Sequence, residues 1–150
     1  MQLHDNWAKG KCPLLNGVIF ADGTYYPIRH VAQPRRSFPV ELFFDPARQM
    51  TPLSSIGEWT QITPLCEVVD QSKGIFAVAG EGGMGADGFI ALMHSDRVLQ
   101  WNAFFTFSNP FIALLLVGDE LVARNNHGEH WRVPLSTPWK ITIEKPNQTD

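Results

Sequence analysis

Short apolar stretches separated by turn residues run along this chain, and the clearest group covers residues 111–135. The run at 111–117 is apolar throughout and has the length of one strand, which predicts a strand buried on both faces. Segments 118–119 and 125–128 contain Gly, Asn and Asp, the residues that tolerate tight-turn backbone angles. Segment 129–135 alternates between apolar and polar residues. We therefore predict three antiparallel strands here.

The rest of the chain repeats this pattern at roughly 8–12-residue spacing, which is typical of all-β domains. No stretch indicates a helix, and five prolines between Pro34 and Pro64 exclude long central strands there. We predict an all-β, mainly antiparallel fold: a single-domain meander over residues 1–150 that forms a sandwich, a barrel or a strongly curved sheet with little helix. Residues 1–13 and 145–150 are predicted to be loose termini. Further strands are expected at 14–20, 24–31, 40–44, 56–63, 65–70, 74–79, 89–94, 98–107 and 139–144.

Alternation also predicts which side chains share a face. In segment 98–107 the predicted inward residues are Leu99, Trp101, Ala103, Phe105 and Phe107. The predicted central core consists of Leu114, Leu116, Trp131, Val133, Ile141 and Ile143.

The charge balance argues against several classes of partner. The chain is 44% hydrophobic and 18% charged, with a formal net charge of −3 and no basic run, which disfavours direct binding to nucleic acid. No apolar run approaches a membrane span, and no secretory signal is evident at the N-terminus. Cys12 and Cys66 fit no CxxC pattern, so we expect free thiols in a cytoplasmic protein, although one disulfide is an alternative.

A glycine-rich loop lies between Gly80 and Gly88 and contains a GxGxxG pattern after an apolar strand. In a dinucleotide-binding fold this loop must open a helix, but here a strand-like segment follows it. We therefore predict a hairpin loop that stays mobile or becomes ordered on a partner, and no cofactor.

The segment from His127 to His130 carries metal-ligand residue types, but a hairpin directs Glu129 and His130 to opposite faces. We predict no metal site. A Cys–His pair using Cys12 or Cys66 has no local support, and no GxSxG motif is present. We predict no catalytic residue, and the sequence favours a protein that is not an enzyme.

Exposed acidic and aromatic residues are the remaining candidates for a binding site. Carboxylates at the predicted turns would form a negative rim if those turns shared one end of the sheet. Adjacent strand residues face opposite ways, so one of two neighbouring tyrosines should be exposed. The predicted partner-binding residues are Glu81, Asp87, Asp119, Glu120, Glu129, Tyr25 and Tyr26.

These features favour a protein–protein interaction module. Its most concrete form is a stoichiometric inhibitor, such as a bacterial immunity protein that neutralises a toxin enzyme. The alternative is a small-ligand-binding β domain or hydrolase, with a cleft near the Gly80–Gly88 loop and the turn from His127 to His130.

Overall fold

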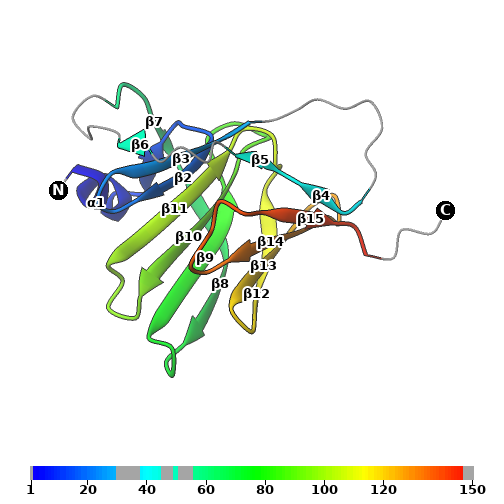
Figure 1. Ribbon diagram of the computed structural model, residues 1–150. Helices are drawn as coiled ribbons and strands as arrows, with labels where there is room; N and C mark the ends of the chain where they lie inside the picture. The colour runs from blue at the N-terminus through cyan, green and yellow to red at the C-terminus, as the bar shows by residue number, and fades with distance from the viewer. Residues whose placement is uncertain (1, 30–37, 45–48, 51–55, 147–150) are drawn as a thin grey trace.

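The computed structural model describes residues 2–29, 38–44, 49–50 and 56–146 (Figure 1). Antiparallel strands dominate these residues, and α1 (Gln2–Ala8) is a helix of seven residues. The predicted antiparallel β fold with little helix is confirmed. Within the described chain, no helix has the length and apolar character needed to cross a bilayer.

Two large sheets pack face to face as a sandwich, and a small two-stranded sheet lies outside them (Figure 1). Every strand pair described is antiparallel. The eight-stranded sheet has the order β5 (Phe43–Phe44), β3 (Thr24–Arg29), β2 (Gly17–Phe20), β11 (Leu99–Phe105), β10 (Gly88–His94), β9 (Ile75–Glu81), β8 (Thr63–Asp70), and β6 (Gln49–Met50) also pairs with β3. The five-stranded sheet has the order β12 (Phe111–Val117), β13 (Glu120–Asn125), β14 (His130–Pro134), β15 (Thr142–Glu144), β4 (Val40–Glu41). The small sheet pairs β1 (Lys11–Pro13) with β7 (Trp59–Gln61).

The central core fills the space between the two large sheets. Trp131 on β14 is fully buried there and contacts Phe105 of β11, with ring centroids 4.9 Å apart. The predicted core residues lie together in this layer: Leu114, Trp131, Val133, Ile141 and Ile143 are buried, and Leu116 is partly buried against them. Alternation along the strands was therefore enough to place these residues in the core.

A second core lies on the outer face of the eight-stranded sheet, beneath α1, β1 and β7. Leu3 of α1 and Cys12 of β1 are buried against Phe89 and Phe104 of the sheet. The sequence predicts a loose terminus over residues 1–13 and no helix, but the structure places α1 and β1 there. Leu3 and Trp7, one helical turn apart, give α1 an apolar face that packs on the sheet.

A β-bulge interrupts the ladder between β10 and β11, so side chains of β11 on either side of it point to different faces of the sheet. Met93 pairs with Leu99 and Leu92 with Trp101, so Gln100 is the extra residue. Leu99 therefore belongs to the outer core and Trp101 to the central core, which corrects the prediction that both lie on one face.

Strand β12 differs from its prediction as well. The apolar run at 111–117 forms a strand as expected, but it is buried on only one face, because β12 is an edge strand of the five-stranded sheet, whose outer face no described element covers. Ile112, Leu115 and Val117 are 44%, 62% and 52% exposed. Strands β9, β10 and β11, which are neighbours in the eight-stranded sheet, are the long strands buried on both faces.

Candidate functional site

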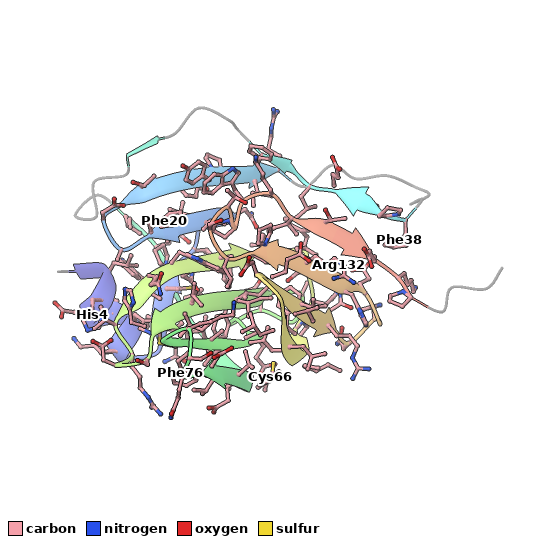
Figure 2. All side chains as sticks on the ribbon, turned by 60° about the horizontal axis from the view of Figure 1, so that its bottom comes forward. His4, Phe20, Phe38, Cys66, Phe76 and Arg132 are labelled. Atoms are coloured by element: carbon pink, nitrogen blue, oxygen red, sulfur yellow. The ribbon has the colours of Figure 1, made fainter. Side chains whose placement is uncertain are left out.

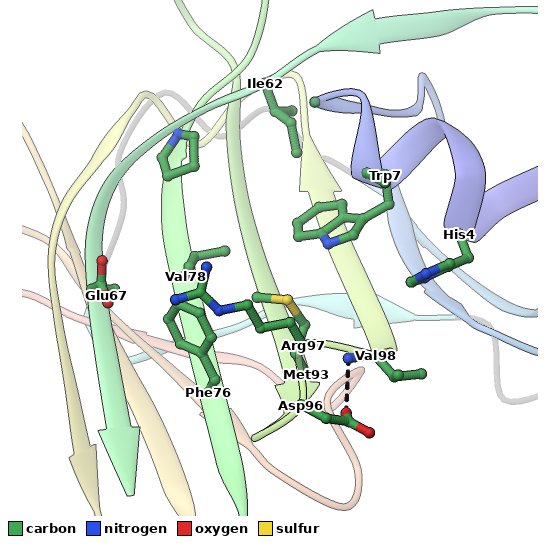
Figure 3. A pocket seen from close by; sticks show the side chains of 13 residues that line it. His4, Trp7, Ile62, Glu67, Phe76, Val78, Met93, Asp96, Arg97 and Val98 are labelled. Atoms are coloured by element: carbon green, nitrogen blue, oxygen red, sulfur yellow. Dashed lines mark hydrogen bonds between the residues drawn. The ribbon is translucent and has the colours of Figure 1, made fainter.

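An apolar groove of about 620 Å³ lies on the outer face of the eight-stranded sheet, beside α1 (Figure 3). Its floor comes from Phe76 and Val78 of β9 and Met93 of β10; Phe76 and Met93 are cross-strand partners on one face. Helix α1 forms one wall with His4, Trp7 and Ala8, and β8 lies opposite with Pro64 and Glu67. The groove therefore lies where the cover formed by α1 and the small sheet stops.

Arg97 is the charged residue that lies over the groove floor. Its guanidinium carbon is 4.7 Å from the Phe76 ring centroid, a cation–π contact (Figure 3). Among the described residues, no carboxylate lies within ion-pair distance of this guanidinium. The neighbouring carboxylate of Asp96 is engaged in the turn, where its Oδ1 accepts a hydrogen bond of 3.0 Å from Val98 N.

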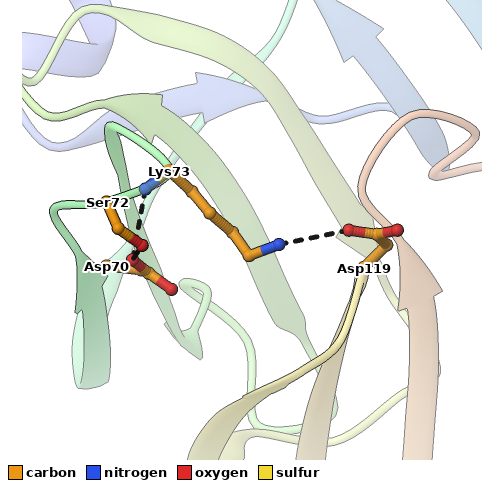
Figure 4. A network of polar contacts seen from close by, with 4 residues as sticks. All are labelled: Asp70, Ser72, Lys73 and Asp119. Atoms are coloured by element: carbon orange, nitrogen blue, oxygen red, sulfur yellow. Dashed lines mark hydrogen bonds and ion pairs between the residues drawn. The ribbon is translucent and has the colours of Figure 1, made fainter.

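A second exposed apolar surface, the β8–β12 seam, consists of Leu65, Val69, Ile112, Leu115 and Val117, which are 44–62% exposed. Strands β8 and β12 lie side by side at one corner of the sandwich (Figure 2). Cys66 Sγ is 3.9 Å from Phe111 O at one end, and the Lys73–Asp119 ion pair, 3.2 Å long, joins the turns at the other (Figure 4). No backbone ladder joins the two strands within the described residues.

The predicted acidic residues do not gather at one end of the sheets. Asp119 pairs with Lys73, which precedes the start of β9, whereas Glu81 ends that strand. Seven residues of strand separate these ends by roughly 20 Å. Glu120 lies at the Asp119 end and Glu129 at the other, so the turns do not share one end and the condition for a single negative rim is not met.

Several of these carboxylates are also engaged inside the protein. Asp87 is only 1% exposed, and its Oδ2 accepts a hydrogen bond from Met84 N at 3.0 Å. Glu129 Oε1 accepts hydrogen bonds from Asn125 Nδ2 at 2.8 Å and Trp131 Nε1 at 3.3 Å. These contacts hold the loops in place and leave less carboxylate surface for a partner.

The two tyrosines point to opposite faces of β3, as predicted, but neither is fully exposed. Tyr26 stacks on Trp139 with ring centroids 3.8 Å apart and an interplanar angle of 6°. Tyr25 is packed against the outer core and donates a hydrogen bond from its hydroxyl to Asn16 O at 2.5 Å. Their main visible role is packing.

The glycine-rich loop joins β9 to β10 as a hairpin, as predicted, and two of its glycines have a packing role. A Cβ at Gly80 would collide with the Thr63 carbonyl oxygen, and one at Gly88 would collide with the Asn109 carbonyl oxygen and Ser108 Oγ. Close backbone approach therefore explains these two glycines.

The histidines of the candidate cleft do not converge. His94 ends β10 beside Ile75, whereas the turn from His127 to His130 lies near Ser108, at the Gly88 end of the same strand. Over the described ranges, no group of three or more His, Cys, Asp or Glu residues could hold a metal ion.

Both cysteines are free, and burial makes them poor nucleophiles. Burial raises the pKa of the Cys12 thiol to about 12. It also raises the pKa of Cys66, whose thiol donates to Ala79 O at 3.5 Å. The reactive species is the thiolate, so neither thiol is activated for attack at neutral pH.

Sequence reasoning missed both exposed surfaces. The spacing of Leu3 and Trp7 was a signal for α1 and hence for one groove wall. Arg97 in a short hairpin turn gave no signal, because its contact with Phe76 depends on how three strands and the turn are arranged. Comparison with protein-family models, curated proteins and solved structures found no match to this chain.

Proposed function

We propose that this protein is a protein–protein interaction module that binds its partner through the β8–β12 seam. The observation that carries the proposal is the clustering of exposed apolar side chains. Among the described residues seven large apolar side chains are exposed, and five of them lie on these two neighbouring strands. A cluster of exposed apolar side chains on neighbouring strands of a folded protein is typical of interaction sites.

The concrete form of the proposal is a stoichiometric inhibitor of an enzyme, such as a bacterial immunity protein that neutralises a toxin. An apolar strip with a polar edge supports it, since Lys73 and Asp119 flank the seam and would remain at the rim of an interface. The acidic residues contribute less to this proposal because they are divided between two ends of the sheets. The free thiols of Cys12 and Cys66 favour a cytoplasmic setting.

A charge insertion into the seam tests this proposal. Leu115→Lys with Val117→Lys places two charges on exposed positions of β12, so the fold should tolerate them. Glu58→Lys changes the net charge by the same two units at an exposed position beside the small sheet, where the Glu58 carbonyl accepts a hydrogen bond from Leu14 N, away from the seam. Affinity purification from the native cell, with quantitative mass spectrometry, compares wild type, seam variant and control.

The expected result is a protein recovered in a 1:1 ratio with wild type and with the control variant, and lost with the seam variant. Equal recovery of every bound protein by all three forms would remove the seam from the proposed function. Unchanged melting temperatures are required of both variants, because unfolding would also abolish recovery.

Small-ligand binding is the second candidate function, and the groove favours it. Its volume of about 620 Å³ falls within the range of ligand sites, and its lining is mostly apolar with a few charged groups. The groove lies beside α1, so this candidate differs in position from the cleft expected near the Gly80–Gly88 loop.

A further inference from the structure

We propose that the groove beside α1 binds a small amphiphilic carboxylate, an aliphatic or aryl acid with one negative charge. Its apolar body would lie on Phe76, Val78 and Met93, and its carboxylate would bind the Arg97 guanidinium. This proposal rests on the second candidate function, small-ligand binding, and is independent of the β8–β12 seam.

The groove floor explains the apolar part of the ligand. Phe76, Val78 and Met93 belong to the outer core, yet all three also line the groove, where α1 no longer covers the sheet. Trp7 and Val98 extend the apolar lining on the side of α1 and the β10–β11 turn (Figure 3). A bound aliphatic or aromatic group would complete the cover and would remove chiefly Trp7 and Val98 from water, since the three floor residues are only 5–7% exposed.

The position of Arg97 explains the negative charge. Stacking on Phe76 uses one flat face of the guanidinium, whereas its five N–H donors radiate in the plane of the group. No described carboxylate takes them, so a pair of donors is free for the two oxygens of a carboxylate. The apolar floor beneath would strengthen that contact by excluding water.

The backbone at Arg97 supports a role beyond turn formation. Arg97 has a φ of +70°, a conformation that Gly adopts readily and a long side chain adopts only at a cost. The turn itself needs the backbone bond from Arg97 N to His94 O and no feature of the side chain. A role of its guanidinium in the groove would explain why an arginine occupies this position.

The acidic residues of the groove lining support a competing expectation, a ligand with a positive charge. Glu67 lies across the groove on β8, Asp96 lies in the turn and His4 lies on α1. Asp96 is engaged with Val98 N, and Glu67 lies at the opposite wall from α1. If Glu67 and Asp96 contributed more to ligand binding than Arg97, the groove would prefer an amine to a carboxylate. The charge of the preferred ligand therefore decides between these two expectations.

Titration calorimetry with octanoate, octanol and octylamine, each below its micelle concentration, tests the proposal. We expect octanoate to bind about tenfold more tightly than octanol, and octylamine to bind most weakly. Arg97→Gln should remove the advantage of octanoate while leaving octanol binding unchanged. Arg124→Gln removes an exposed arginine on β13 and serves as the matched control, with no expected change.

Ala8→Trp provides a second variant, because Ala8 is exposed and lines the groove, so filling it should weaken all three ligands without disturbing the core. Octanol binding without an octanoate advantage, or tighter binding of octylamine, would refute the carboxylate proposal and leave small-ligand binding intact. No binding of any of the three compounds would refute both. Binding that Ala8→Trp leaves unchanged would place the ligand elsewhere and also refute the proposal.

Discussion

The outer faces of the two large sheets are shielded from water in different ways. Phe76, Val78 and Phe89 make the outer face of the eight-stranded sheet apolar, and α1 with the small sheet covers most of it. The five-stranded sheet has no such cover among the described elements. Arg132 on its outer face instead lies beside Val122 and forms ion pairs with Glu120 and Glu144.

This difference shows where each sheet has surface left for binding. On the eight-stranded sheet the cover ends before the apolar face does, which leaves the groove. On the five-stranded sheet the polar row ends before β12, which leaves Leu115 and Val117 exposed. Each candidate surface therefore lies where the shielding of an outer face ends. The groove lies at the edge of the cover formed by α1 and the small sheet, and the exposed residues of β12 lie beyond the polar row.

The largest expected effect comes from the core that both sheets share. Leu121→Ala removes a fully buried side chain of β13 and should lower the free energy of unfolding by ~2–5 kcal/mol. Leu115→Ala, on the neighbouring strand but 62% exposed, should change it by less than ~0.5 kcal/mol. Urea denaturation measures both. Equal losses would show that β12 is buried on both faces after all.

The pH dependence of the free energy of unfolding should show that Cys12 is shielded from water in the outer core. The Cys12 thiol stays protonated to about pH 12 in the folded protein, whereas in the unfolded chain it ionises above its ordinary pKa of 9.0. The folded-state pKa is raised, so the stabilisation is present below pH 9 and is lost as pH rises toward 12. Its full size is roughly 4 kcal/mol, at ~1.4 kcal/mol per pH unit.

Denaturant melts between pH 8 and pH 11 measure this effect by comparing wild type with Cys12→Ala. The wild type should lose more stability than the variant over this range. Parallel curves would indicate that Cys12 reaches solvent. The half-buried Cys66 provides the control, since Cys66→Ala should flatten the curve less.

Loosening α1 from the eight-stranded sheet should lower the free energy of unfolding by less, and its effect should be local. Leu3→Ala removes the buried anchor of α1 and should cost about 2 kcal/mol, near the lower end for a buried leucine because α1 has only seven residues. Hydrogen exchange should rise in α1 and over β9 and β10 beneath it, while β13 and β14 stay protected. Uniform loss of protection would show that α1 supports the whole sandwich.

The sequence predicted the central core well and the surfaces poorly, for a physical reason. Alternation reports which side chains share a face, and this placed Trp131, Val133 and Ile143 correctly. Alternation does not report whether another element covers that face. The apolar run of β12 therefore predicted burial that does not occur, and the covered strands β9 and β10 gave no sign of the groove above them.

The smallest expected effect concerns the ion pairs that protect the uncovered face. Arg132 Nε donates to Glu144 Oε1 at 2.9 Å and Nη1 to Glu120 Oε1 at 3.4 Å, and both partners are more than a third exposed. Solvent screens such pairs, so Arg132→Met, which keeps an apolar stem beside Val122, should cost less than ~1 kcal/mol. The loss should shrink further in high salt, since exposed charges are screened there. Arg132→Ser removes the stem as well and should cost more than Arg132→Met at both salt concentrations. Equal, salt-sensitive losses in the two variants would show that charge, rather than coverage of Val122, is what Arg132 contributes to this face.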